Sequence, residues 1–233
     1  MMFLEGNVKK ITVILGLCLV LLVLASGCSD KEISPETNPE MGVAGAAALT
    51  DCHIENCVNT LEVLATTEEV KSGDWEIMLP LLTKTDEVMV TGPKWFALPD
   101  GSYYVVGMGK TAKNITDRAY FPVVMSGSNT YSELVVSRST GEKVLVIAVP
   151  VIREGEVIGA LGISVFLEDL SDIISKQLKL ADDLVFYAVT AENQVALHTD
   201  TEMILVDKPE SPENSVSLTA PFTGWLITLG HSN

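Results

Sequence analysis

The feature that most constrains the fold is a run of three strand-like segments in the middle of the chain. "ELVVSRS", "KVLVIAVPVI" and "EVIGALGISVF" are separated by Thr140-Gly141 and Glu154-Gly155, which are short turn signals. Strands joined by turns this tight pair as antiparallel neighbours. The middle segment is almost continuously apolar, which predicts a strand covered on both faces. Because Pro150 cannot donate to a strand ladder, we expect a bulge or a strand end there.

Helical spacing precedes this run. Apolar residues recur three and four apart around Ile54 and Leu61, which predicts a helix from near Met41 to Thr66. "DWEIMLPLLTK" reads as a shorter helix interrupted at Pro80. "KWFALPDGSYYVVGMG" then predicts a hairpin, and "TAKNITDRAYFPVVMSG" predicts a short helix and loops that cross a face of the sheet.

The remaining segments complete the expected domain. "LEDLSDIISKQL" has helical spacing, "DLVFYAVTAENQVALHTD" reads as a hairpin turning near Glu192-Asn193, and "SVSLTAPFTGWLITLG" reads as a strand or a strand pair. A long helix followed by an antiparallel sheet with short crossing helices is an α+β fold. We expect residues 41–233 to form a single domain.

The first 27 residues have the pattern of an export signal. Lys9 and Lys10 precede the apolar run "ITVILGLCLVLLVLA", which is short for a membrane span of ~20 residues. The run ends in "LASGC", which resembles a lipobox, and the resemblance implies lipid attachment at Cys28. Residues 28–40 are polar with two prolines and read as a tether. The alternative is an uncleaved N-terminal anchor, and both interpretations place the remainder outside the cytoplasm.

Two cysteines, Cys52 and Cys57, lie within the predicted long helix. Five helical positions span ~7.5 Å of rise, which exceeds the usual Cα separation of a disulfide. Either the helix starts after Cys52, or the thiols are free, or they pair between chains. His53 beside them gives too few ligands to predict a metal site, and no cofactor is expected.

The composition argues against several classes of function. A net charge of -16 disfavours nucleic acid, which is bound through Lys and Arg. His53, His198 and His231 lie in unrelated contexts, and neither a nucleophile motif nor a phosphate-binding glycine loop occurs. The sequence therefore predicts a protein that is not an enzyme.

Four segments, taken in order, resemble the Cache family of PAS-like extracytoplasmic sensor domains. They are "KWFALPDGSYY", "NITDRAYFPVVMSG", "VVSRSTGEKVLVIAVPV" and "EVIGALGISVFLEDLSDII". The resemblance covers roughly residues 45 to 230. It implies a pocket for a small molecule between the sheet and the segments that cross it.

The resemblance also implies site residues. In the amino-acid-binding branch an arginine followed by two aromatics holds the ligand carboxylate, and Arg118, Tyr120 and Phe121 match that pattern. Two aspartates that bind the ligand ammonium group are replaced here by Ser137 and Ser164, and Lys113 stands where a tyrosine is expected. We also expect Trp95 and Tyr104, on the first hairpin, to contribute. Strand alternation sends either Tyr103 or Tyr104 inward without deciding which.

The loss of both acids predicts the type of ligand. A guanidinium matches a carboxylate in bidentate fashion, whereas an ammonium buried without a counter-charge is costly. We therefore expect a carboxylate or other small polar ligand without a free α-amino group. The alternative for Arg118 is an ion pair with Asp117 or another surface acid.

The expected protein is a membrane-tethered sensing module without its own signalling output domain, since the chain stops at Asn233. A separate membrane receptor or transporter is a candidate partner. The resemblance also implies a homodimer through the long helix as a candidate assembly. The alternative is a structural or partner-binding lipoprotein whose pocket has closed.

Overall fold

The structure is a computed structural model that describes residues 39–87 and 92–232. The predicted signal peptide and most of the predicted tether lie outside these residues. From Pro39 onward the chain forms one compact unit. Its elements begin with three helices, α2 (Pro39–Ala65), α3 (Glu68–Lys71) and α4 (Trp75–Asp86). None of the helices in the described part is long and apolar enough to cross a membrane.

The long predicted helix is confirmed as α2, which starts at Pro39, so the last two residues of the predicted tether belong to it. Proline suits the first turn because its missing N–H would have no intrahelical partner there. Both cysteines lie on α2 and no disulfide joins them. Cys52 is exposed and Cys57 is buried, and because α2 includes both residues, the alternative that the helix starts after Cys52 is wrong.

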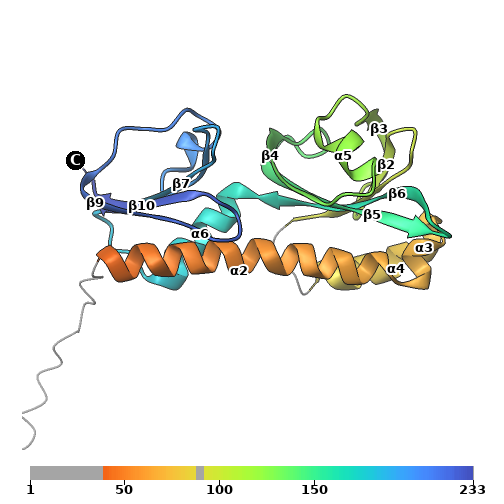
Figure 1. Cartoon of the computed structure of the whole chain (residues 1–233), viewed down its shortest axis with the longest axis horizontal. Coiled ribbons are helices and arrows are strands. Elements are labelled where there is room, and N and C mark those ends of the chain that lie inside the picture. The colour runs from red at the N-terminus through yellow and green to blue at the C-terminus, as the bar shows by residue number, and fades with distance from the viewer. Residues whose placement is uncertain (1–38, 88–91, 233) are drawn as a thin grey trace, which may run out of the picture. The chain divides into compact units, whose positions relative to one another are not determined.

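A six-stranded antiparallel sheet lies beside the second half of α2 (Figure 1). Its strand order is β3-β2-β1-β6-β5-β4. The predicted first hairpin and the predicted three-stranded run are confirmed within it. The strands are β1 (Lys94–Ala97), β2 (Ser102–Val105), β3 (Gly109–Asn114), β4 (Thr130–Val136), β5 (Lys143–Arg153) and β6 (Glu156–Phe166).

The later strands form a second, four-stranded antiparallel sheet with the order β8-β7-β10-β9. It comprises β7 (Leu184–Val189), β8 (Val195–His198), β9 (Glu213–Thr219) and β10 (Leu226–His231), with the 3-10 helix η1 (Thr201–Met203) after β8. Helix α6 (Leu167–Leu178) connects the two sheets and coincides with its predicted segment. The predicted α+β class is confirmed. The strands divide between two sheets, because β6 leads into α6 rather than into another strand of the first sheet.

Strand β5 is buried on both faces, as its continuous apolar sequence predicts. Leu145 and Ile147 belong to the core between the sheet and α2, whereas Val144 and Val146 belong to a second core under α5 (Tyr120–Met125). Pro150 pairs with β6 beyond the last residue that β4 pairs, so its missing N–H removes no bond to β4. The bulge follows one residue later, at Val151.

The predicted interruption at Pro80 is wrong, because α4 runs without a break from Trp75 to Asp86. Pro80 is exposed, so the carbonyl of the preceding turn that loses its partner can bond to water. Met78 and Leu82, on either side of it, are fully buried in the core and hold the helix together. Tertiary packing therefore overrides the local preference of proline.

Asp51 fastens α2 to the turn between β9 and β10. Its carboxylate is largely buried and accepts hydrogen bonds from the Phe222 N–H (2.8 Å), the Thr223 N–H (3.0 Å) and the Thr223 hydroxyl (2.9 Å). These bonds join residues more than 170 positions apart in the chain. Asp51 thus holds this turn against α2, and the stacking of Phe222 on Tyr131 also holds it in place.

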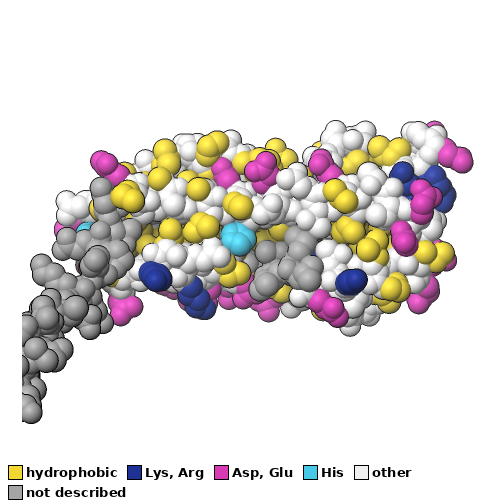
Figure 2. All heavy atoms as spheres, turned by 90° about the horizontal axis from the view of Figure 1, so that it is seen from below, with side chains coloured by type: hydrophobic (Ala, Val, Ile, Leu, Met, Phe, Trp, Pro, Cys, Tyr) yellow, Lys and Arg dark blue, Asp and Glu magenta, His cyan; other side chains and the backbone are white. Residues whose placement is uncertain are grey.

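Figure 2 views the molecule from the α2 side. Hydrophobic side chains are interspersed with acidic ones over this face, and few Lys or Arg side chains are seen. The exposed apolar side chains of α2 include Met41 and Val63.

Candidate functional site

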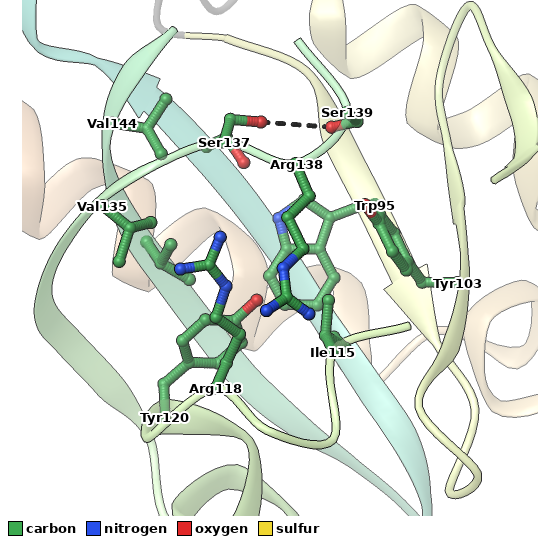
Figure 3. Close-up of a pocket in the computed structure, with 12 residues that line it drawn as sticks. Trp95, Tyr103, Ile115, Arg118, Tyr120, Val135, Ser137, Arg138, Ser139 and Val144 are labelled. Carbon is green, nitrogen blue, oxygen red and sulfur yellow. Dashed lines mark hydrogen bonds between the residues drawn. The ribbon is translucent and has the colours of Figure 1, made fainter. Parts of the chain in front are cut away.

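A small cavity lies on the face of the six-stranded sheet that points away from α2 (Figure 3). The sheet forms its floor, and the segment before α5 and the turn after β4 cover it. Its volume is about 30 Å³, which is room for only one or two water molecules. The lining residues are Trp95, Tyr103, Ile115, Arg118, Tyr120, Val135, Ser137, Arg138, Ser139, Val144, Val146 and Ser164.

The floor depends on Gly162. Strand pairing places Trp95 opposite Gly162, and the indole ring lies directly over the glycine. A Cβ added there would stand 2.1 Å from the ring, which is far inside van der Waals contact. Only glycine therefore lets the indole lie flat on β6. Tyr120 meets the same indole with ring centroids 6.0 Å apart.

Arg118 lines the cavity from the segment that precedes α5. Its side chain is half-buried, and its Nη2 donates to the carbonyl oxygen of Val136 at 2.9 Å. Within the described part of the chain no carboxylate forms an ion pair with Arg118. The expected alternative pairing with Asp117 does not occur, because Asp117 pairs with Arg138 instead.

Arg138 is a second cation at the cavity. Its two terminal nitrogens each lie 2.6 Å from an Asp117 carboxylate oxygen, in a bidentate arrangement. Nη1 also donates to the carbonyl oxygen of Asn114. The hydrogen bonds with Arg138 lower the pKa of the Asp117 carboxyl and raise that of the guanidinium, so both groups are charged.

Four polar side chains in the cavity wall have no hydrogen-bond partner. Trp95, Tyr103, Tyr120 and Ser164 are each at most 8% exposed, and their N–H or O–H groups make no hydrogen bond within the described residues. No fully enclosed side-chain nitrogen or oxygen in this part of the chain lacks a partner, so these four groups keep some accessible surface. All four residues line the cavity. Since buried polar groups are normally satisfied, these four are available to a polar ligand.

Tyr120 remains a neutral phenol at physiological pH. Burial is the main cause that raises its pKa, and it outweighs the opposing effect of nearby Arg118. The Tyr120 backbone N–H donates to Glu133 Oε2 at 2.7 Å, which anchors the start of α5 to β4. The phenol can thus donate a hydrogen bond to an oxygen in the cavity without adding negative charge to it.

The structure brings most of the predicted site residues together. Trp95, Arg118, Tyr120, Ser137 and Ser164 line the cavity. The Ser137 hydroxyl is already engaged, 3.2 Å from Ser139 Oγ and accepting from the Thr140 N–H.

Two predicted residues lie elsewhere. Tyr104 points to the opposite face of the sheet and stacks on Trp75, with ring centroids 5.2 Å apart. Phe121 is buried under the same face as the cavity but is absent from its lining. Alternation along β2 makes Tyr103, rather than Tyr104, the tyrosine that faces the cavity.

The sequence reasoning missed Arg138 and Ser139 as lining residues, and it left open whether Tyr103 or Tyr104 faces inward. Arg138 and Ser139 belong to the "SRSTG" turn, whose signal indicates a reversal of the chain and not the direction of its side chains. No local pattern links Arg138 to Asp117, which is 21 positions earlier.

No family model and no curated protein match the sequence. Solved structures do match. The ligand-binding domain of Pseudomonas aeruginosa chemoreceptor PctC, in complex with GABA, has a TM-score of 0.65 at 16% identity and covers 82% of this chain and 97% of that one. The chain has the fold of a receptor sensor domain.

Two further structures extend the comparison of this sensor-domain fold. The V. cholerae histidine kinase DctB sensor domain has a TM-score of 0.64 at 11% identity, covering 83% of this chain and 95% of that one. The Pseudomonas fluorescens chemoreceptor CtaA domain, in complex with L-serine, has a TM-score of 0.62 at 15% identity, covering 79% and 91%. At these identities the likeness establishes the fold, and the chemistry must come from the cavity itself.

The cavity of this sensor-domain fold favours an anion. Two guanidinium groups and four unpartnered polar groups line it, and none of the lining residues carries a carboxylate. A guanidinium offers a planar pair of donors that fits a carboxylate. The arrangement thus suits a ligand rich in acceptor oxygens.

Proposed function

We propose that the chain is an extracytoplasmic, membrane-tethered sensing module that binds a small carboxylate ligand without a free α-amino group. The observation that carries the proposal is the charge of the cavity wall, which has two guanidinium groups and no acid among its lining residues. An ammonium group placed there would lie beside two cations, and the nearby Asp117 carboxylate is already bonded to Arg138, so burying the ammonium would be costly. A carboxylate would satisfy Arg118 and accept from Tyr120, Tyr103 and Ser164.

A second candidate is a structural or partner-binding lipoprotein with a closed pocket. The small size of the cavity favours it, because pockets that hold small molecules usually have volumes of about 300 to 1,000 Å³. The two candidates differ in whether any small molecule stabilises the protein.

Thermal unfolding of the full-length protein in detergent tests the proposal. Propionate and succinate, compared with L-alanine and L-aspartate, form pairs that differ by an α-amino group. A ligand at a hundred times its Kd adds about 2.7 kcal/mol, which for a domain of this size raises Tm by roughly 5 to 10 °C. We expect that rise from at least one amino-free acid and none from its amino counterpart. A larger rise with L-alanine or L-aspartate contradicts the proposed ligand class, and no rise with any of the four favours the structural candidate.

The membrane attachment is proposed from the sequence alone. "LASGC" resembles a lipobox and a polar tether follows it, so we propose that Cys28 carries lipid. A single acyl chain holds a protein only marginally, so stable attachment requires a multiply acylated cysteine. Folded residues beyond the tether then face the extracytoplasmic side, where a separate membrane receptor or transporter is the proposed partner and a homodimer the proposed assembly.

Metabolic labelling with a fatty acid tests this attachment. The wild-type protein and a Cys18→Ser control are expected to take up label, whereas Cys28→Ser loses it entirely. Mass spectrometry of the wild-type protein should find an N-terminus at Cys28. A wild-type chain that retains residues 1–27 and takes up no label would instead identify an uncleaved anchor.

A further inference from the structure

The cavity as it stands is too small for the ligand class proposed above. About 30 Å³ admits one or two water molecules, while even a short organic acid has several heavy atoms. Trp95, Tyr103, Tyr120 and Ser164 nevertheless line it, and their polar side-chain groups have no partner among the described residues. Binding therefore requires that one side of the cavity move outward.

The side that can move is the one that Arg138 closes. Arg138 extends from the turn after β4 to the segment before α5, where it holds Asp117 and the Asn114 carbonyl oxygen. Figure 3 shows its guanidinium group beside that of Arg118 in the middle of the site. The Arg138 side chain thus bridges the two segments that cover the cavity.

The ion pair between Arg138 and Asp117 can be broken at little cost in free energy. The side chains of Arg138 and Asp117 are 31% and 67% exposed, so water solvates both of them. Ion pairs exposed to this extent contribute little to stability, and the released Asp117 would remain hydrated. The rest of the cavity wall is packed: Trp95 lies against Gly162 and Tyr120 is anchored to Glu133. The Arg138 bridge is therefore the part of the wall that costs least to open.

The two guanidinium groups share one carboxylate. Among the residues that the structure describes, Arg118 bonds only to a carbonyl oxygen, and Arg138 binds both oxygens of Asp117. The three groups together therefore carry one net positive charge. A monocarboxylate would neutralise Arg118 but would offer no acid to Arg138 once the bridge has opened. A second carboxylate on the same ligand could replace Asp117 on Arg138. The apolar side chains of Ile115, Val144 and Val146 suit the short carbon chain between two such groups.

We propose that Arg138 is a latch that closes the cavity through Asp117 and exchanges that partner for the second carboxylate of a short dicarboxylate. The inference rests on the proposed function, since it requires that Arg118 hold the first carboxylate. It makes Arg138 a specificity-determining residue, which selects dianions over monoanions.

Isothermal titration of the full-length protein in detergent tests the latch, with succinate, its monomethyl ester and inorganic phosphate as probes. The ester keeps the carbon chain and one carboxylate but loses the second charge. We expect succinate to bind about tenfold more tightly than the ester, since a hydrogen bond to a charged group is worth that factor or more. Phosphate, which has no carbon chain to occupy the apolar wall, should bind more weakly than succinate.

Three variants complete the test. Arg138→Gln should weaken succinate to the affinity of the ester and leave the ester itself within about twofold. Asp117→Asn removes the internal competitor and should strengthen succinate by roughly two- to fivefold, the range expected for an exposed ion pair. Arg153→Gln, on the β5–β6 hairpin and bonded to Lys71 and Ser72 carbonyl oxygens, is the matched control and should change nothing.

The outcomes separate the latch from the proposed function. Equal affinities for succinate and the ester, or an equal loss of both in Arg138→Gln, overturn the latch and leave carboxylate binding intact. Phosphate that binds as tightly as succinate overturns the dicarboxylate assignment. If neither acid binds at millimolar concentration, the latch and the carboxylate proposal fail together. Should Arg138→Gln not fold, an unchanged succinate affinity in Asp117→Asn also overturns the exchange.

Discussion

Replacing Arg118 with glutamine is expected to weaken the binding of both propionate and succinate by about 10- to 100-fold. A hydrogen bond to a charged group contributes about 1.5–3 kcal/mol, and glutamine keeps the length of the side chain without its charge. The affinity of Arg118→Lys should lie between those of the wild type and Arg118→Gln, because an ammonium keeps the charge but cannot form the bidentate contact. Isothermal titration of the three proteins measures the effect.

The same Arg153→Gln variant serves as the control for Arg118→Gln. The Arg118 side chain bonds to a single carbonyl oxygen, so the variant should fold normally, with a Tm within a few degrees of wild type. A folded Arg118→Gln protein that binds both acids as the wild type does would place the carboxylate elsewhere. The polar groups of the cavity wall that lack hydrogen-bond partners would then need another explanation.

The second large effect is on stability. Asp51→Ala leaves the Phe222 and Thr223 N–H groups and the Thr223 hydroxyl without their acceptor. Each buried donor that loses its partner costs about 1–3 kcal/mol, and the turn is half-buried, so water recovers part of the loss. We expect a total of about 2–4 kcal/mol, or a fall in Tm of roughly 5 to 15 °C.

Two further variants on α2 serve as comparisons for Asp51→Ala. Asp51→Asn keeps one acceptor oxygen but places an amide donor against a backbone N–H, so its loss should be intermediate. Glu55→Ala, an exposed position on α2, should change the free energy of unfolding by no more than about 0.5 kcal/mol. If Asp51→Ala unfolds like Glu55→Ala in a urea titration, the turn is held by its own strands and not by α2.

The sequence predicts those parts of the fold whose signals are local. Tight turns between apolar segments identify the β4–β5–β6 run, and helical spacing gives α6 with its bounds. Strand β3 was not predicted, because "GKTAKN" is polar and lies on an exposed edge where periodicity carries no signal. The division into two sheets depends on pairings such as β7 with β10, between segments far apart in the chain, which no local pattern encodes.

The residues of the candidate site, like the elements of the fold, could be predicted only in part from the sequence. Of the residues carried over by the family resemblance, Arg118, Tyr120, Ser137 and Ser164 lie around one cavity in the structure, whereas Phe121 is not in its lining. The direction of Tyr103 follows from strand register, which the sequence leaves open by one residue. The contact of Arg138 with Asp117 depends on how a turn and a loop meet in space, so only the folded chain reveals it.

Helix α2 is one continuous element that connects the two sheets. It is a single helix of 27 residues, about 40 Å long, and it packs against strands of both sheets. Its Pro39 end lies beneath β9 and β10, and its other end lies near α3 (Figure 1). An unbroken rod turns small angles into distances: a rotation of about 3° at one end moves the other by about 2 Å. Because α2 contacts strands of both sheets, a change in how the six-stranded sheet packs on the helix would also alter its position against β9 and β10.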